Sequence, residues 1–105
     1  LKIGPFYILQ DAFLTSSESN VRNMLIGMQE SQKWGSPVML GYFPDTFGNM
    51  GQTPQLMQQV NITTAAFGRG VRPIGFDNQI LSDENYSSQF SEMNWIGPDF
   101  RNTFC

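Results

Sequence analysis

Three polar side chains follow apolar stretches that have the composition of buried strands, and they are the residues best placed to do chemistry. Asp11 follows PFYILQ, Asp45 follows SPVMLGYF, and Arg69 lies near the end of TTAAFGRG. A carboxylate can act as a nucleophile, a base or a metal ligand, and an arginine can keep a neighbouring carboxylate charged. The ordinary alternatives stay open, because an aspartate in a turn commonly accepts backbone hydrogen bonds and an arginine commonly lies at the surface.

The residue types that are missing limit this chemistry. The 105 residues include no histidine and one cysteine. Neither a Ser-His-Asp arrangement nor a histidine-containing zinc site can therefore be completed within the chain itself. A single cysteine cannot form an internal disulfide either, so we expect a reducing, cytoplasmic location.

Charge and hydropathy argue against two classes of partner. The formal net charge is −3, and the six lysines and arginines are scattered along the chain. They leave no basic patch that could neutralise a phosphate backbone, so nucleic acid is not an expected partner. No stretch approaches the roughly 18 uninterrupted apolar residues of a membrane span, so no membrane partner is expected.

Alternating strands and helices would position the three polar residues. Short apolar stretches at residues 5–10, 36–43 and 63–70 predict strands. Each pair of strands is separated by a stretch with the features of a helix, and this spacing is typical of parallel βαβ units, so the predicted fold class is α/β. Because the carboxyl ends of parallel strands meet at one edge, we expect Asp11, Asp45 and Arg69 to converge on one rim.

The two helices between these strands have recognisable ends. The first is predicted between Ser16 as a cap and Gly35 as a stop, with an apolar stripe at helical spacing formed by Val21, Met24, Leu25 and Met28. The second is predicted over residues 53–60, with Thr53 as its cap and Pro54 at its first position.

The remainder of the chain is less regular. Residues 71–89 show no sustained period and predict a long loop, while residues 91–100 predict a further strand that runs into a turn at Gly97, Pro98 and Asp99. The chain begins at Leu1 without a methionine and stops just after GPDFRNTF. We therefore expect it to be a segment of a longer chain, which we call the parent protein.

Six stretches, in this order, carry a resemblance to a known family: IGPFYILQDAF, VRNMLIG, GYFPDTFG, QTPQLMQQ, FGRGV and SEMNWIGPD. Together they resemble the catalytic domain of family 38 glycoside hydrolases, the retaining α-mannosidases, and in particular their bacterial branch. The resemblance implies that residues 1–105 form part of a catalytic (β/α) barrel. It also implies that the parent protein cleaves α-mannosidic bonds with retention of anomeric configuration, and that the segment alone is inactive.

The resemblance also implies roles for individual residues. Asp45 matches the family's catalytic nucleophile, which is also a ligand of an active-site zinc ion, and Phe47 matches an aromatic that lies against the bound mannose. Arg69 matches an arginine near the nucleophile, and Asp11 is a weaker candidate for contact with the substrate. The remaining zinc ligands and the general acid/base would lie outside these residues. The substrate would be an α-mannoside or a mannose-containing oligosaccharide, and a homo-oligomeric parent protein stays open.

Three departures from the family pattern fall close to these residues. Ala12 stands where the family usually has glutamate, Asn49 where it usually has histidine, and Gly68 where it usually has tryptophan. An active parent enzyme is the favoured interpretation, because Asp45, Phe47 and Arg69 are all present. A weakened relative that binds carbohydrate without turnover, or a purely structural segment, would be the alternatives.

Overall fold

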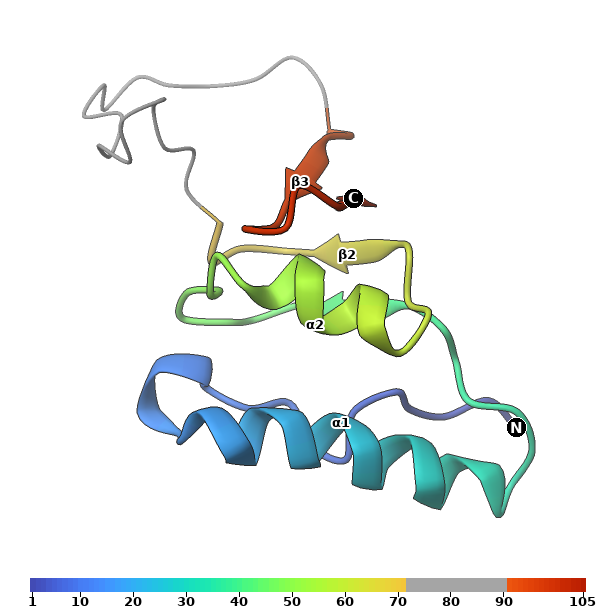
Figure 1. Cartoon of the computed structure of the whole chain (residues 1–105). Coiled ribbons are helices and arrows are strands. Elements are labelled where there is room, and N and C mark those ends of the chain that lie inside the picture. Colours follow the sequence, from blue (N-terminus) through green and yellow to red (C-terminus); the bar gives the residue numbers. More distant parts are fainter. Residues whose placement is uncertain (72–90) are drawn as a thin grey trace, which may run out of the picture.

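The computed structural model describes residues 1–71 and 91–105. In order along the chain the elements are a 3-10 helix η1 (Ala12–Leu14), α1 (Ser17–Gln32), β1 (Gly41–Phe43), α2 (Thr53–Gln59), β2 (Ala65–Phe67), β3 (Asn94–Ile96) and β4 (Asn102–Phe104). Helix α1 lies on one side of the β1–β2 pair and the β3–β4 hairpin lies on the other (Figure 1). The predicted loop at 71–89 falls outside the described residues, apart from Val71.

Helix α1 confirms the first predicted helix, but its buried face differs from the predicted stripe. Ser16 is the N-cap, and its side chain accepts a hydrogen bond from the Ser19 backbone N–H. The residues that α1 buries are Asn20, Met24, Gly27 and Ser31. Val21 and Leu25 of the predicted stripe are exposed, so only Met24 of the four predicted positions is buried.

The predicted strand over residues 5–10 is wrong. These residues form an irregular segment that lies along α1, and Gly27 lets it approach, because a Cβ at that position would overlap the backbone of Pro5 and Phe6. The Tyr7 N–H donates to the Asn23 carbonyl oxygen at 3.0 Å, and the Asn23 side chain bonds both the N–H and the carbonyl of Ile8 at 2.9 Å. Helix α1 thus takes the backbone hydrogen bonds that a neighbouring strand would otherwise use.

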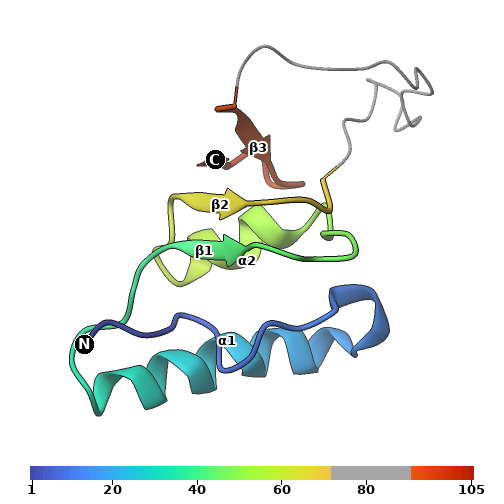
Figure 2. The same cartoon turned by 180° about the vertical axis from the view of Figure 1, so that it is seen from behind.

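Strands β1 and β2 confirm the predicted parallel sheet at reduced length. Gly41, Tyr42 and Phe43 pair in parallel register with Ala65, Ala66 and Phe67. Figure 2 shows the two strands side by side, running in the same direction. The earlier part of the predicted strand 36–43 does not join this pair, and the Val38 N–H instead donates to the Ile3 carbonyl oxygen at 3.0 Å.

Helix α2 forms the crossover between the two parallel strands. It begins one residue earlier than predicted, because Gln52 is the N-cap and Thr53 is already helical. Pro54 lies in the first turn, where its missing N–H costs no helical hydrogen bond. The helix buries Met57, which belongs to the core with Met24, Phe43, Ile62 and Ala65.

The C-terminal residues form a hairpin that the sequence predicted only in part. The strand and turn expected over residues 91–100 are confirmed as β3 and a turn at Pro98 and Asp99, but β4 was not anticipated. Strands β3 and β4 pair antiparallel, and an isolated parallel bridge joins Thr64 to Phe104. This bridge connects the hairpin to the chain just before β2. The hairpin also contacts β1, because the ring centroids of Trp95 and Phe43 lie 6.0 Å apart.

The fold class is therefore mixed helix and sheet with a parallel pair, as predicted. The described residues contain two parallel strands and one antiparallel hairpin, so the predicted (β/α) barrel is not confirmed within them. No helix in the described part of the chain is long and apolar enough to cross a membrane.

Candidate functional site

Asp45 and Arg69 lie at the same edge of the parallel pair because β1 and β2 end in register. Phe43 is paired with Phe67, and the Gly68 N–H extends the ladder by donating to the Phe43 carbonyl oxygen at 3.0 Å. Each candidate follows its strand by two residues. The sequence-based expectation that these two side chains share a rim is confirmed.

The two side chains form an ion pair. Arg69 Nε lies 2.7 Å from Asp45 Oδ1, and the side chains are 50% and 77% exposed, respectively. An ion pair this exposed contributes at most about 1 kcal/mol to stability, since water screens it. Its location at the strand ends makes it a feature of a surface site and not of the core.

Phe47 completes a compact group with these two residues. The Arg69 guanidinium carbon lies 4.3 Å from the centroid of the Phe47 ring, a separation typical of cation–π contacts. The ring is 72% exposed. A carboxylate, a guanidinium and an aromatic ring therefore meet at an open rim, and such a group can bind a polar ligand that also has an apolar face.

Two further side chains connect the loops that carry this group. Thr46 Oγ1 donates to the Arg69 carbonyl oxygen at 3.1 Å and accepts from Asn49 Nδ2 at 3.0 Å. Asn49 Nδ2 also lies 3.4 Å from the Gly70 carbonyl oxygen. Sequence reasoning noted Asn49 only as a departure from the family and missed Thr46, because no local pattern reveals a hydrogen bond across 23 residues.

Glycines permit the close approach of the two loops. A Cβ at Gly68 would fall well inside 3.0 Å of the Pro44 carbonyl oxygen, and Gly70 has a φ of +84° that favours glycine. The structure gives the physical reason for the small residue at position 68, because Pro44 occupies the space that a side chain would need.

Asp11 is not brought into contact with Asp45 or Arg69 among the described residues. It precedes η1, and its carbonyl oxygen accepts hydrogen bonds from the Leu14 N–H and from the hydroxyl of Thr15, the C-cap of η1. The expectation that it closes a strand is wrong, since residues 5–10 form no strand. The Asp11 loop nevertheless contacts the Asp45 loop. The Phe13 ring packs so closely against Gly48 that a Cβ added at Gly48 would lie 2.6 Å from the ring.

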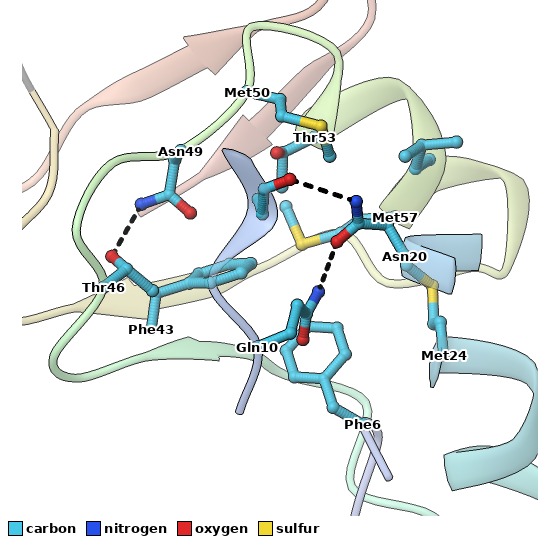
Figure 3. Close-up of a pocket in the computed structure, with 12 residues that line it drawn as sticks. Phe6, Gln10, Asn20, Met24, Phe43, Thr46, Asn49, Met50, Thr53 and Met57 are labelled. Atoms are coloured by element: carbon cyan, nitrogen blue, oxygen red, sulfur yellow. Dashed lines mark hydrogen bonds between the residues drawn. The ribbon is translucent and has the colours of Figure 1, made fainter. Parts of the chain in front are cut away.

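A small cavity lies between α1, α2 and the loops that carry Asp11 and Asp45 (Figure 3). Its volume is about 20 Å³, and Gln10, Ala12, Asn20, Thr46 and Asn49 contribute to its lining. That volume suffices for about one water molecule and not for a sugar ring. Any carbohydrate bound by Asp45 and Phe47 would therefore lie on the open rim and not inside this cavity.

The described residues do not provide a complete metal site. No group of three or more histidine, cysteine, aspartate or glutamate side chains comes together within residues 1–71 and 91–105. Asp45 is the carboxylate at the rim, and Arg69 pairs with its Oδ1 atom. Asp45 could supply one ligand to a zinc site, and the others would have to come from elsewhere in the parent protein.

The comparison with known proteins decides the family. The sequence profile described as the glycosyl hydrolases family 38 N-terminal domain matches residues 2–105. The chain belongs to glycoside hydrolase family 38. A relative from Halalkalibacterium halodurans, named "Putative mannosylglycerate hydrolase", is 58% identical over 100 residues, which are 94% of this chain and 11% of that protein.

Two solved structures of proteins from Enterococcus faecalis are also similar. One, from strain V583, is described as an α-mannosidase and is 71% identical with a TM-score of 0.79, covering 98% of this chain and 11% of that one. The other, described as a glycosyl hydrolase family 38 protein, is 58% identical with a TM-score of 0.71, covering 98% of this chain and 9% of that one. The chain thus spans about a tenth of the length of these relatives.

Proposed function

We propose that the parent protein is a retaining α-mannosidase and that these residues carry its nucleophile, Asp45. Membership of family 38 supports a glycoside hydrolase, and the two named relatives are a "Putative mannosylglycerate hydrolase" and an α-mannosidase. The observation that carries the residue assignment is the convergence of Asp45, Arg69 and Phe47 at the strand ends. The barrel, the oligomeric state and a cytoplasmic location remain predictions.

In the proposed mechanism, the Asp45 carboxylate attacks the anomeric carbon of the mannoside. The bond from this carbon to the leaving oxygen breaks, and a general acid from another part of the parent protein protonates that oxygen. Water, activated by the same residue now acting as a base, then attacks the anomeric carbon and releases mannose and Asp45. Two inversions at one carbon give retention.

Arg69 and Phe47 would support this step in different ways. The Arg69 guanidinium, with its Nε 2.7 Å from Asp45 Oδ1, can orient the carboxylate for attack. Phe47 offers an exposed aromatic surface for the apolar face of the sugar. Asp11, on the neighbouring loop, is proposed to contact hydroxyl groups of the substrate.

Zinc is the proposed cofactor, with Asp45 as one of its ligands. When bound, the metal would supply Lewis-acid stabilisation and orient the sugar hydroxyl groups. The chain's own contribution is the Asp45 carboxylate. Arg69 pairs with its Oδ1 atom, which leaves Oδ2 as the oxygen not engaged in that pair.

Substitution of Asp45 in the full-length parent protein tests the assignment. Asp45→Asn keeps the shape of the side chain but removes the anionic nucleophile, so kcat on a chromogenic α-mannoside should fall by at least about a thousandfold. Arg69→Ala should cost on the order of a hundredfold, because it supports the carboxylate without forming the bond.

Glu18→Gln is a matched control for Asp45→Asn. Glu18 is also an exposed carboxylate in a 2.7 Å ion pair, with Arg22, but it lies on α1. Its substitution should leave kcat unchanged. If Asp45→Asn retained more than about a tenth of the parent kcat, Asp45 would not be the nucleophile. Normal sugar affinity of the unsubstituted protein without any product would instead favour the carbohydrate-binding alternative.

A further inference from the structure

The loop after β1 and the loop after β2 are joined beyond the last backbone bond of the sheet. That last bond runs from the Gly68 N–H to the Phe43 carbonyl oxygen. Beyond it, the connections come from two side chains of one loop, Thr46 and Asn49, which bond the Arg69 and Gly70 carbonyl oxygens of the other. Figure 3 shows the Asn49 amide directed at the Thr46 hydroxyl.

The donors and acceptors of this connection are consistent with one another. A carbonyl oxygen can only accept, so Thr46 Oγ1 uses its proton on the Arg69 carbonyl. The hydroxyl then has lone pairs for the Asn49 amide, and the Gly70 carbonyl also requires the nitrogen side of Asn49 to face it. Both contacts of Asn49 therefore fix the same orientation of its amide group.

We propose that Thr46 and Asn49 form a positioning bridge that holds Arg69 against Asp45 and Phe47. This inference rests on the proposed function of Asp45. Neither bridge residue touches the substrate in this account, and both act by fixing the backbone from which the Arg69 side chain extends. Asn49 thereby has a role of its own, through its bonds to Thr46 and to the Gly70 carbonyl oxygen.

The exposure of Arg69 explains why a bridge is needed. The guanidinium ends a long side chain with many rotamers, and its ion pair with Asp45 is open to water, where such pairs are weak. The cation–π contact with Phe47 is also at an exposed ring. Weak contacts hold a flexible side chain in one place only if the backbone on which it starts is itself fixed.

Gly70 shows that the local backbone is shaped around this bridge. A Cβ at Gly70 would meet Thr46 at both its hydroxyl and its carbonyl oxygen and would lie 3.1 Å from the Gly48 nitrogen. The φ of +84° at Gly70 is also one that other residues rarely adopt. The close approach of Thr46 to residues 69 and 70 thus depends on glycine at this position.

A double-mutant cycle in the full-length parent protein tests the bridge. Thr46→Val removes the hydroxyl but keeps the branched shape, and it should lower kcat on the order of tenfold with a small change in KM. In an Arg69→Ala background the same substitution should cost less than about twofold, because the bridge acts through Arg69. Thr46→Ser, which keeps the hydroxyl, should retain nearly the parent kcat.

Thr64→Val is the matched control. Thr64 is an exposed threonine just before β2, and its hydroxyl makes no hydrogen bond to another described residue. This variant should keep the parent kcat in both backgrounds. If Thr46→Val does not fold, Asn49→Ala replaces it in the cycle, because it removes the bond to Thr46 and the contact with Gly70.

The outcomes separate this inference from the proposed function. If Asp45→Asn is inactive but Thr46→Val behaves like Thr64→Val, the bridge is wrong and the nucleophile stands. An equal loss from Thr46→Val with and without Arg69 would also overturn the bridge, because it would show a general structural role. If Asp45→Asn is active, the proposed function itself fails.

Discussion

Gly68→Ala is the substitution for which the structure gives the most direct geometric expectation. The added Cβ would fall well inside 3.0 Å of the Pro44 carbonyl oxygen and 3.3 Å from its carbonyl carbon, whereas ordinary contacts lie at 3.4–4 Å. The obstacle is backbone, so it cannot rotate away as a side chain would. Pro44 must move by on the order of 0.5–1 Å, and overpacking of this kind costs about 1–3 kcal/mol.

This movement would reach the proposed nucleophile, because Pro44 directly precedes Asp45. A misplacement of about 1 Å in a catalytic group can lower a rate on the order of a hundredfold. We expect Gly68→Ala in the parent protein to lower kcat by about tenfold to a hundredfold and to lower the melting temperature. Turnover of a chromogenic α-mannoside and a thermal melt followed by circular dichroism would measure both effects.

Gly51→Ala provides a control in the loop after β1, which also carries Pro44 and Asp45. A Cβ at Gly51 would meet no atom of a described residue within 4 Å. This variant should keep the parent kcat and either keep or slightly raise the stability, since alanine restricts the unfolded chain. If Gly68→Ala matched Gly51→Ala in both kcat and melting temperature, the close packing of Pro44 against Gly68 would be refuted.

Three further predictions concern the rest of the segment. Gly27→Ala should destabilise the parent protein by about 1–3 kcal/mol through overlap with Pro5 and Phe6, although alanine is intrinsically favoured in a helix by about 1 kcal/mol; an increased melting temperature would contradict this. Burial raises the pKa of the Cys105 thiol, so the folded state favours the neutral thiol and its contribution to stability should be complete below about pH 9 and lost at higher pH. Alkylation of Cys105 should accordingly be slower than that of a small free thiol at the same pH, and equal rates would exclude the effect. The isolated segment should bind zinc no better than a single exposed carboxylate does, and submicromolar affinity by calorimetry would mean that the metal site is misplaced.

The elements that local signals define were predictable from the sequence. Ser16 as a cap and Pro54 in a first turn located α1 and α2 to within a residue or two, since capping depends on neighbouring residues only. The parallel pairing of β1 and β2 followed from the order of the elements. The shared rim of Asp45 and Arg69 followed in turn from parallel pairing.

The features that failed depend on contacts between distant residues. Residues 5–10 have the composition of a strand, yet Asn23 of α1 takes the hydrogen bonds of Tyr7 and Ile8. A polar side chain on a helix gives no sign in the sequence that it will replace a strand. Asp11 was misplaced for the same reason, because its predicted position depended on that strand.

The roles of Thr46 and Asn49 also could not be read from spacing. Each contributes a hydrogen bond to a loop more than 20 residues away. The strand β4 was missed because a three-residue strand is too short to show a period. Its pairing is visible only once β3 and the turn at Pro98 and Asp99 bring it back alongside.

Trapping the covalent intermediate tests the central claim most directly. A fluorinated mannosyl fluoride combines a good leaving group with a fluorine that slows hydrolysis of the glycosyl-enzyme, so the full-length parent protein should gain the mass of one fluoromannosyl group. Proteolysis and tandem mass spectrometry should place that group on Asp45, and the Asp45→Asn protein should remain unlabelled. A stable label on a different carboxylate, or an active enzyme that releases mannose with inverted configuration, would contradict the account.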